Sequence, residues 1–230
     1  KKVFVDLKSK KKIKELILKK KINIIIHAAS FTNIEYIEKN KKASYKNNFL
    51  TTKNIAEVCK ETNTKLVYIS TDQLYSDNLK KYDEKSELTP LNYYGYLKKI
   101  SEIVVYKNSK KNLIIRTNFF CIGTSYRKSL SDYIIDNIKF KKNIYMFNDI
   151  FFSPVYVMSL IKIILKLISS NEKGIFNISS DDKISKYKFA IYLAKLFKLD
   201  KTYIKKASIN DFKMVKRPKK MYLINKKIKQ

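Results

Sequence analysis

The sequence predicts an α/β fold of the Rossmann type, in which a doubly wound parallel sheet precedes a small C-terminal α/β lobe. Short apolar runs rich in β-branched residues, such as residues 22–26 and 66–69, alternate with longer stretches whose apolar residues recur at helical spacing. The apolar runs end in small or hydroxyl-bearing residues. Open sheets of this kind bind ligands beyond the carboxyl ends of their strands, so we expect a ligand site at those ends.

The first half of the chain is expected to contain three strands and two helices. A short strand at residues 3–7 precedes a lysine-rich helical segment. Residues 22–26 are all isoleucine except Asn23, so we expect a strand that is buried on both faces of a parallel sheet. A helix over residues 41–61 and another buried strand over residues 66–69 follow.

The second half is expected to alternate in the same way. Ser185 precedes a stretch of helical spacing and is a suitable N-cap, because its hydroxyl can accept a hydrogen bond from a free backbone N–H of the first turn. The expected elements are a helix that opens within residues 90–98, a strand at 113–115, a helix at 130–140, a strand at 144–147, a helix at 157–167, a strand at 174–178 and a helix that opens at Ser185.

The composition favours a packed core, and the charge does not by itself indicate a nucleic-acid site. The 230 residues are 45% hydrophobic, which is enough for a folded domain, and the formal net charge is +30. Only Arg116, Arg127 and Arg217 are arginines, whereas sites that read bases or clamp phosphates favour arginine. We interpret the excess lysine as solvated surface side chains and expect no specific nucleic acid as a partner.

The cysteines and the apolar runs indicate a cytoplasmic protein without a metal site. Cys59 and Cys121 lie in apolar stretches without the spacing of metal ligands, so we expect reduced core cysteines. No apolar run is long enough to span a bilayer, and the basic N-terminus leads into a charged segment instead of a signal sequence. We expect no membrane partner, and a homodimer is left open.

Tyr94 and Lys98 form the most informative pair in the sequence. Four residues apart on a helix, they lie on one face, and both can reach the same small molecule. An ammonium near a phenol favours the phenolate and lowers the phenol pKa, which makes the tyrosine a better proton donor at neutral pH. A hydroxyl from the preceding strand end, Thr71 or Ser70, can hold a substrate carbonyl. Strand alternation allows only one of these two to point toward the substrate.

The surrounding motifs resemble a known family. The motif Y-G-x-x-K-x-x-x-E that begins at Tyr94 follows P-L-N at residues 90–92 and S-T-D at residues 70–72. This set resembles the extended short-chain dehydrogenase/reductase family and, within it, the dTDP-4-dehydrorhamnose reductases. The resemblance implies that Tyr94 is the proton donor, that Lys98 holds the nicotinamide ribose and tunes the tyrosine, and that Thr71 is the third catalytic group.

The resemblance also implies a cofactor, NADPH or NADH. The segment H-A-A-S at residues 27–30 resembles the part of the family that borders the nicotinamide, although His27 itself is interpreted as a structural histidine. Asn48 matches a helix asparagine that supports the active site. Asp6 stands where the family contacts adenine, with a surface turn as the alternative. The expected cofactor-binding residues are Asp6, Ala28, Ala29, Ser30, Asn48, Ser70, Tyr94 and Lys98.

Three substrate-binding residues follow from the same resemblance: Asn118, Ser153 and Arg217. Asn118 begins the loop after a predicted strand, and Ser153 belongs to a D-x-x-x-S-P motif. Arg217 suits a nucleotide diphosphate because a guanidinium matches a phosphate, and a structural arginine is the alternative. Phe152 and Ser159 depart from the family pattern, so the particular sugar is not determined.

The motifs together cover nearly the whole chain and imply a function. We expect NAD(P)H-dependent reduction of a 4-keto nucleotide sugar in deoxysugar or cell-surface polysaccharide biosynthesis. Residues 1–123 are expected to form an incomplete NAD(P)-binding domain, and residues 124–230 a mixed region with the substrate-binding lobe. A non-catalytic regulatory subunit, like the β-subunit of methionine adenosyltransferase, is one alternative. A lysine-rich nucleic-acid binder is the other.

One part of the family pattern is missing from the sequence. The family begins with a strand and a glycine-rich turn that brings backbone N–H groups to the cofactor pyrophosphate, whereas this chain has only Gly95, Gly123 and Gly174. We therefore expect the 230 residues alone to bind NADPH weakly or not at all and to be inactive. A longer form that carries the upstream strand and turn is expected to bind NADPH.

Overall fold

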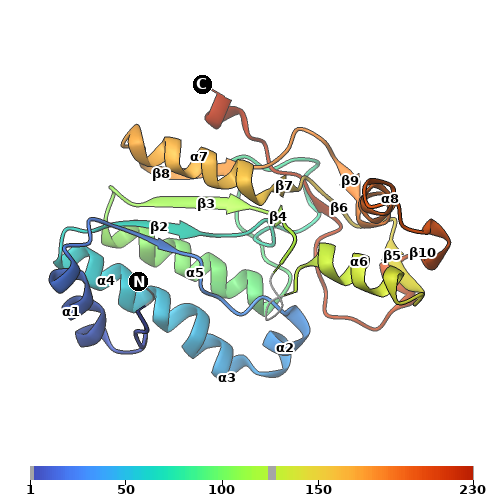
Figure 1. Cartoon of the computed structure of the whole chain (residues 1–230). Helices are drawn as coiled ribbons and strands as arrows, with labels where there is room; N and C mark the ends of the chain where they lie inside the picture. Colours follow the sequence, from blue (N-terminus) through green and yellow to red (C-terminus); the bar gives the residue numbers. More distant parts are fainter. Residues whose placement is uncertain (1–2, 124–127, 230) are drawn as a thin grey trace.

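The computed structural model describes residues 3–123 and 128–229, and its main feature is a four-stranded parallel sheet (Figure 1). The strands lie in the order β1-β2-β3-β8, and each adjacent pair is parallel. Parallel strands require crossover connections, and helices supply them here. The predicted Rossmann-type α/β fold is confirmed. The strands are β1 (Ile24–His27), β2 (Lys65–Ile69), β3 (Leu113–Thr117) and β8 (Gly174–Ile178).

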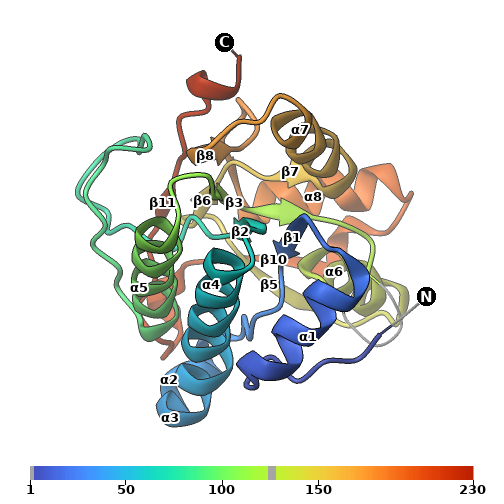
Figure 2. The ribbon, with the colours of Figure 1, turned by 90° about the vertical axis from the view of Figure 1, so that its left-hand side faces the viewer.

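Helices cover both faces of this sheet, as Figures 1 and 2 show. On one face, Ile55 of α4 and Val105 of α5 share a buried cluster with Tyr68 of β2. On the other face, Ile164 of α7 packs in a cluster with Val67 of β2. The strands therefore alternate their side chains between two cores. The helices are α1 (Lys10–Lys20), α4 (Thr51–Glu61), α5 (Tyr93–Asn108) and α7 (Val157–Ser169).

A smaller C-terminal lobe has a core of its own, as predicted. Two parallel strands, β5 and β10, pack with α6 and α8 around buried residues that include Ile138, Ile144, Phe152 and Leu193. Ser185 caps α8, because its hydroxyl accepts a hydrogen bond from Lys188 N at 3.1 Å. The elements of the lobe are α6 (Leu130–Lys139), α8 (Lys186–Leu196), β5 (Ile144–Phe147) and β10 (Ile204–Ala207).

Short elements join the main sheet to the lobe. Strands β4 and β7 form one parallel pair, and β6 lies between β11 and β9 in a three-stranded sheet. The short strands are β4 (Phe119–Phe120), β6 (Phe151–Phe152), β7 (Val155–Tyr156), β9 (Ile184–Ser185) and β11 (Lys220–Met221). The 3-10 turns are η2 (Lys201–Tyr203), η3 (Ile209–Asp211) and η4 (Lys226–Lys229).

The chain enters the lobe after β4 and then returns to the main sheet. Helix α7 and strand β8 follow residue 123 in the sequence, yet α7 covers a face of the main sheet and β8 pairs with β3. Residues 186–207 then return to the lobe with α8 and β10. The division of the chain at residue 123 into two units stays a prediction.

The predicted strand at residues 3–7 is wrong. Residues 3–6 pair with no described strand, and a turn begins at Leu7. A strand is stable only when a neighbour pairs with its backbone, and these residues do not pair with the free edge of the described sheet at β1. Val5 and Leu7 instead pack against the core beneath α1 and α4, while Phe4 is 96% exposed.

The expected burial of β1 on both faces is also wrong. The strand is found at residues 24–27, but Ile24 is 38% exposed and Ile26 is 49% exposed. Strand β1 lies at the edge of the sheet, and the cluster that α7 forms on this face includes no residue of β1. The backbone on the outer side of β1 is thus available for pairing.

The predicted helix at residues 41–61 is present but not uniform. It consists of α3 (Lys41–Ser44), a π-helical turn η1 (Tyr45–Leu50) and α4. A further helix, α2 (Ile34–Lys39), was not predicted. π-Helical turns often occur at functional sites. Here the π turn carries the buried Asn48.

One of the two cysteines lies outside the core. Cys59 is buried, and desolvation raises the pKa of its thiol to about 12. Cys121 follows the short strand β4 and is only partly buried, so the prediction of two core cysteines is wrong for Cys121. Cys121 lies in the connection between β4 and the helix at residues 130–139, and connecting segments usually run over the surface.

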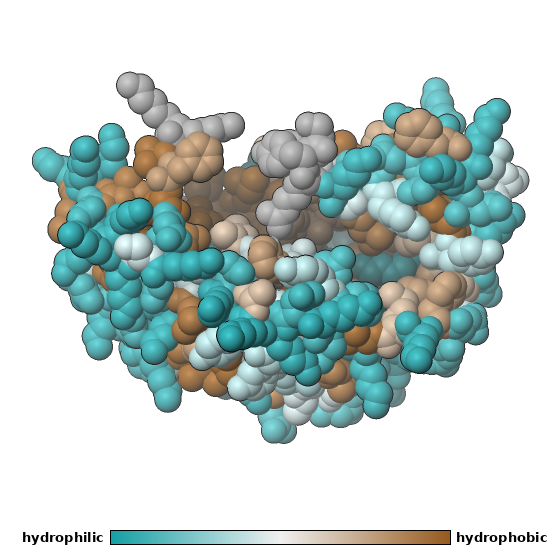
Figure 3. Space-filling view, turned by 90° about the horizontal axis from the view of Figure 1, so that it is seen from below, coloured by the Kyte–Doolittle hydropathy of each residue, from teal (hydrophilic) through white to brown (hydrophobic). Residues whose placement is uncertain are grey.

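The face of the protein seen in Figure 3 is mostly hydrophilic. Figure 3 shows teal side chains over most of one face and brown, apolar side chains around a hollow. Exposed apolar residues of the N-terminal part include Val3, Phe4, Ile24 and Ile26. Within residues 3–123 and 128–229, no helix is both long enough and apolar enough to cross a membrane.

Candidate active site

Two strand ends and the start of a helix meet at one edge of the main sheet. Strands β1 and β2 are parallel, with His27 opposite Tyr68, so their carboxyl ends leave the sheet on the same side. Strand β2 leads directly into Ser70 and Thr71. Helix α5 begins nearby, and the side chain of its N-cap, Asn92, accepts a hydrogen bond from Gly95 N at 2.9 Å. The segments expected to form the strand-end site therefore meet at this edge, and the binding of a ligand there stays a prediction.

Gly95 allows helix α5 to approach the loop after β2. A Cβ atom at Gly95 would lie 2.3 Å from Gln73 O and 2.8 Å from Pro90 Cβ. Both distances are shorter than any normal contact, and Gln73 O is a backbone atom that cannot rotate away. Glycine at this position thus sets the distance between Tyr94 and the loop that carries Thr71.

Replacing Gly95 with Ala is expected to destabilise the protein by about 1–3 kcal/mol, the usual cost of overpacking. The loop must move to accommodate the methyl group, so the binding of any ligand at Thr71 should weaken as well. Urea denaturation measures the first effect. Lys107→Ala on the exposed face of α5 is the control and should change stability little. Equal effects of the two variants would contradict the close approach.

Lys98 connects Tyr94 to the end of strand β2. Its ammonium donates a hydrogen bond to Ile69 O at 2.9 Å and lies 6.0 Å from the centroid of the Tyr94 ring. Lys98 is 5% exposed. Burial lowers the pKa of Lys98 to about 8, because desolvation disfavours the charged form, and the negative charge of Glu102 opposes this shift.

Tyr94 is held in place by apolar neighbours. It is 8% exposed and belongs to a buried cluster with Ile37 of α2 and Leu97 of α5. Phe49 of the π turn packs against the same cluster. The ring therefore has a fixed position next to the lysine one turn further along the helix.

The structure distinguishes the surroundings of the two candidate hydroxyls. Thr71 Oγ accepts a hydrogen bond from Gln73 N at 3.2 Å and donates one to Asp72 Oδ1 at 3.4 Å. Ser70 Oγ is buried and has no hydrogen-bond partner among the described residues. Both residues are almost fully buried, so the choice between Thr71 and Ser70 as the third catalytic group stays a prediction.

Asn48 and His27 support the loop that follows β1. Asn48 Oδ1 accepts from Phe31 N at 2.8 Å, and Asn48 Nδ2 donates to Phe31 O at 2.9 Å. His27 Nε2 lies 2.9 Å from Thr52 Oγ. Burial, together with the charge of Lys98, lowers the pKa of His27 to about 4. A neutral, hydrogen-bonded imidazole agrees with the structural role expected for His27.

The other expected cofactor residues lie at the surface. Ala28 and Ala29 are exposed at the end of β1, and Ser30 is partly buried and donates to Phe31 O at 3.0 Å. Asp6 is exposed in a turn, where Oδ1 accepts from Lys8 N at 3.0 Å. The geometry of Asp6 is that of the alternative considered from the sequence, a surface turn, and its contact with a cofactor stays a prediction.

The three expected substrate residues have different surroundings. Asn118 Nδ2 donates to Asp72 Oδ2 at 2.6 Å, next to Thr71. Ser153 is buried directly after β6. Arg217 forms an ion pair with Glu35 of α2 and donates to Val215 O at 3.2 Å. The guanidinium is thus already paired with the carboxylate of Glu35, so a bound phosphate would share the guanidinium with this carboxylate.

Sequence reasoning missed two charged side chains near the site. Asp72 was noticed only as part of a motif, yet it is 2% exposed, and burial raises the pKa of its carboxyl group. Lys186 begins α8 and interacts with the charge of Asp72. Lys186 gave no signal in a sequence with 50 Lys and Arg residues. Asp72 could have been found from its position directly after Thr71.

Comparison with known proteins identifies the family of this chain. Residues 1–230 match the family model described as the RmlD substrate binding domain. The chain belongs to this family. A dTDP-4-dehydrorhamnose reductase of Aggregatibacter actinomycetemcomitans is 28% identical over 200 residues, which cover 81% of this chain and 65% of that protein. Methionine adenosyltransferase 2 subunit beta of Xenopus laevis is 24% identical over 202 residues, or 84% of this chain and 60% of that protein.

A solved structure agrees with the family assignment. The crystal structure of a dTDP-4-dehydrorhamnose reductase of Bacillus anthracis in complex with NADP has a TM-score of 0.91 and 26% identity to this chain. The match covers 98% of this chain and 80% of that protein. The chain spans less than two thirds of the length of the two curated relatives.

Proposed function

We propose that this protein takes part in the NADPH-dependent reduction of a 4-keto nucleotide sugar. One observation carries the proposal: Tyr94 and Lys98 lie one turn apart on α5, and Lys98 joins the tyrosine to the strand end that bears Ser70 and Thr71. A proton donor, a cation and a hydroxyl at one strand end are the groups that the reduction of a carbonyl needs. The related structure with NADP supports NADPH as the cofactor, with NADH as the alternative.

Each residue of the site has a separate task in this proposal. Tyr94 donates the proton to the oxygen of the reduced carbonyl, and Thr71, or Ser70 in its place, holds that oxygen by a hydrogen bond. Lys98 stabilises the phenolate that remains and binds the ribose hydroxyls of the cofactor. When bound, the nicotinamide supplies the hydride. The small, exposed Ala28 and Ala29 leave room for a cofactor at the end of β1.

The remaining expected residues act around this centre. Asn48 positions the loop after β1, and Asp6, Ser30 and Ser70 are proposed to contact the cofactor. Asn118, Ser153 and Arg217 are proposed to contact the nucleotide sugar. The proposal is tested by following NADPH oxidation with a dTDP-4-keto-6-deoxy sugar, using the protein as its gene encodes it. The absence of oxidation would contradict the proposed function.

Replacing Lys98 with Met is expected to weaken NADPH binding and to slow the reduction together. The ammonium is proposed to serve both the ribose and the phenol, and hydrogen bonds to a charged group are each worth about 1.5–3 kcal/mol, or about a tenfold to a hundredfold loss of affinity. The affinity of the wild-type protein for NADPH should fall as the pH rises through about 8, because Lys98 loses its proton there. The NADPH affinity of Lys98→Met should not fall over this pH range.

Calorimetric titration with NADPH at several pH values measures both effects. Lys99→Met is the matched control, because Lys99 follows Lys98 on α5 but donates to Leu88 O at 2.8 Å, outside the proposed site. Unchanged affinity and rate in Lys98→Met would show that Lys98 only holds the strand end.

A regulatory subunit is the second candidate function, and the similarity to methionine adenosyltransferase 2 subunit beta favours it. The two candidates give different results with Tyr94→Phe. A reductase loses turnover, whereas a regulatory subunit has no turnover to lose and keeps its effect on a partner. A lysine-rich nucleic-acid binder would instead show DNA affinity that falls steeply with added salt.

A further inference from the structure

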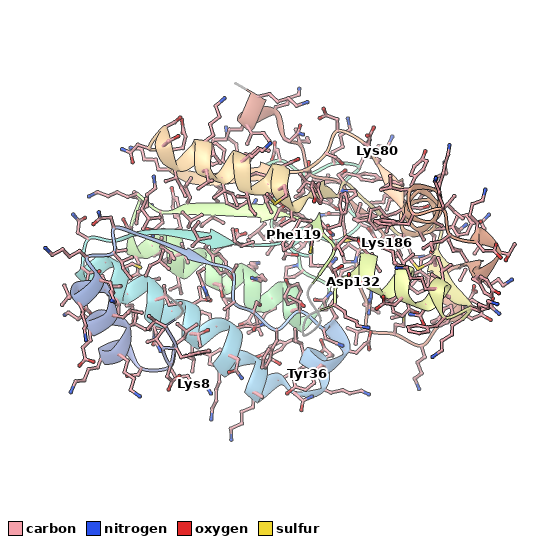
Figure 4. The ribbon with its side chains drawn as sticks, viewed as in Figure 1. Lys8, Tyr36, Lys80, Phe119, Asp132 and Lys186 are labelled. Atoms are coloured by element: carbon pink, nitrogen blue, oxygen red, sulfur yellow. The ribbon has the colours of Figure 1, made fainter. Side chains whose placement is uncertain are left out.

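Lys186 lies at the junction between the main sheet and the C-terminal lobe, as Figure 4 shows. It is the first residue of α8 and follows the N-cap Ser185. Its ammonium lies 3.2 Å from the centroid of the Phe152 ring, within the range of a cation–π contact. The side chain is partly buried, and this position is set by the start of a well-capped helix.

The charged groups that act on Lys186 come from two other segments. Asp72, from the loop after β2, attracts the ammonium, and Arg217 repels it. Burial lowers the pKa of Lys186 to about 8, and Asp72 opposes this shift. Among residues 3–123 and 128–229, the ammonium lies over the Phe152 ring, and no hydrogen bond or ion pair joins it to another side chain or to the backbone. An ammonium has three N–H donors, so Lys186 keeps donors for a ligand.

Two of the expected substrate residues, Asn118 and Ser153, adjoin groups that interact with Lys186, and the third, Arg217, acts on its charge. Asn118 donates to the carboxylate of Asp72, which is the anionic neighbour of Lys186. Ser153 follows Phe152, whose ring the ammonium covers. Arg217 is close enough to affect the charge on Lys186. Lys186 therefore lies near groups from three segments: the residue after β3, the end of β6 and the C-terminal segment.

We propose that Lys186 is a specificity-determining residue that donates hydrogen bonds to oxygens of the sugar ring in the nucleotide sugar. Asp72 is the fixed counter-charge of Lys186 and an acceptor for the same sugar. This inference rests on the proposed function and adds a contact to it. Lys186 belongs to the C-terminal lobe, and Asp72 belongs to the loop that carries Thr71. A sugar that contacts both residues therefore links the lobe to this loop.

The neighbouring carboxylate explains why a sugar suits Lys186 better than a diphosphate does. Asp72 next to Lys186 would repel a diphosphate, whereas a neutral hydroxyl can accept from Lys186 and donate to Asp72 at the same time. Asp72 also follows Thr71, which is proposed to hold the reacting carbonyl. The sugar end of the substrate, and not its nucleotide end, is therefore expected beside Lys186.

Calorimetric titration with dTDP-glucose and with dTDP tests the inference. The wild-type protein should bind dTDP-glucose more tightly than dTDP. Lys186→Met should weaken the binding of dTDP-glucose by about tenfold to a hundredfold, the usual loss for hydrogen bonds to a charged group, and should leave dTDP affinity unchanged. Lys186→Gln, which keeps an N–H donor without the charge, should show a smaller loss. Lys183→Met, at an exposed lysine that lies over Tyr222, is the control.

The pH dependence gives a second measurement that a structural role would not produce. The affinity of the wild-type protein for dTDP-glucose should fall as the pH rises through about 8, where Lys186 loses its proton. The same fall should be absent in Lys186→Met. Asp72 and Arg217 also act on the charge of Lys186. Both are present in the wild-type protein and in Lys186→Met, so a difference in pH dependence between these two proteins comes from Lys186.

Other results would contradict the inference in separate ways. An equal loss of dTDP and dTDP-glucose affinity in Lys186→Met would place Lys186 at the diphosphate. Unchanged affinity for both would show that Lys186 makes no contact with the substrate. If the wild-type protein bound neither probe, the proposed function itself would fail, and this inference would fail with it.

Discussion

Replacing Tyr94 with Phe is expected to slow sugar reduction by about a hundredfold to ten-thousandfold, which is the usual contribution of general acid catalysis. The change removes one hydroxyl, and with it the proposed proton donor. The ring itself packs against Ile37 and Leu97, so the phenylalanine ring of the variant would fill the same space. NADPH affinity should therefore stay nearly unchanged, since Lys98 and the strand end keep their positions.

Steady-state kinetics and NADPH titration separate the two effects. Tyr96→Phe is the matched control, because Tyr96 lies on the same helix and is 46% exposed. It should keep its full rate. A Tyr94→Phe variant that retained most of its turnover would refute the proton-donor role, whatever its affinity for the cofactor.

The regular elements could be predicted because their signals are local. Strands β5 and β8 have the predicted bounds, residues 144–147 and 174–178, since each is a short apolar run between polar segments. The start of α8 was predicted from Ser185, because capping depends only on the first turn of the helix. Tyr94 and Lys98 share a face for an equally local reason, the helical repeat.

The burial of the N-terminal strands could not be predicted in the same way. Whether residues 3–7 become a strand depends on a neighbour that pairs with their backbone, and local composition carries no information about that neighbour. Strand β1 has the composition of a central strand, yet two of its isoleucines are exposed because it lies at the edge of the sheet. The order of the strands in the sheet therefore decides whether residues 3–7 form a strand and how far β1 is buried.

The candidate site was predicted only where its residues are consecutive or follow a repeat. Asp72 and Asn118 meet through a hydrogen bond between segments 46 residues apart in the sequence. Lys186 joins them from yet another segment. Such a cluster depends on how the lobe packs against the sheet, and a lysine in a lysine-rich chain gives no separate signal.

Glu102 shows how one residue of the recognised motif can stabilise the site instead of acting in it. It lies one turn after Lys98 on α5, and its carboxylate accepts from Arg116 Nε at 3.1 Å and from Arg116 Nη2 at 2.7 Å. Both side chains are 3% exposed. The ion pair therefore fixes α5 to β3 in the interior, and with α5 it fixes Tyr94 and Lys98.

Replacing Glu102 with Gln is expected to destabilise the protein by about 3–5 kcal/mol, because removal of one partner leaves a buried charge uncompensated. Arg116 keeps hydrogen bonds to Tyr75 OH at 2.8 Å and to Glu84 O at 3.1 Å, which favours the lower end of this range. Urea denaturation measures the loss. Glu61→Gln, which breaks an exposed pair with Lys14, is the control and should have little effect. Equal stability of the two variants would mean that Arg116 finds enough compensation in its other partners, and that the buried ion pair does not hold α5 against the sheet.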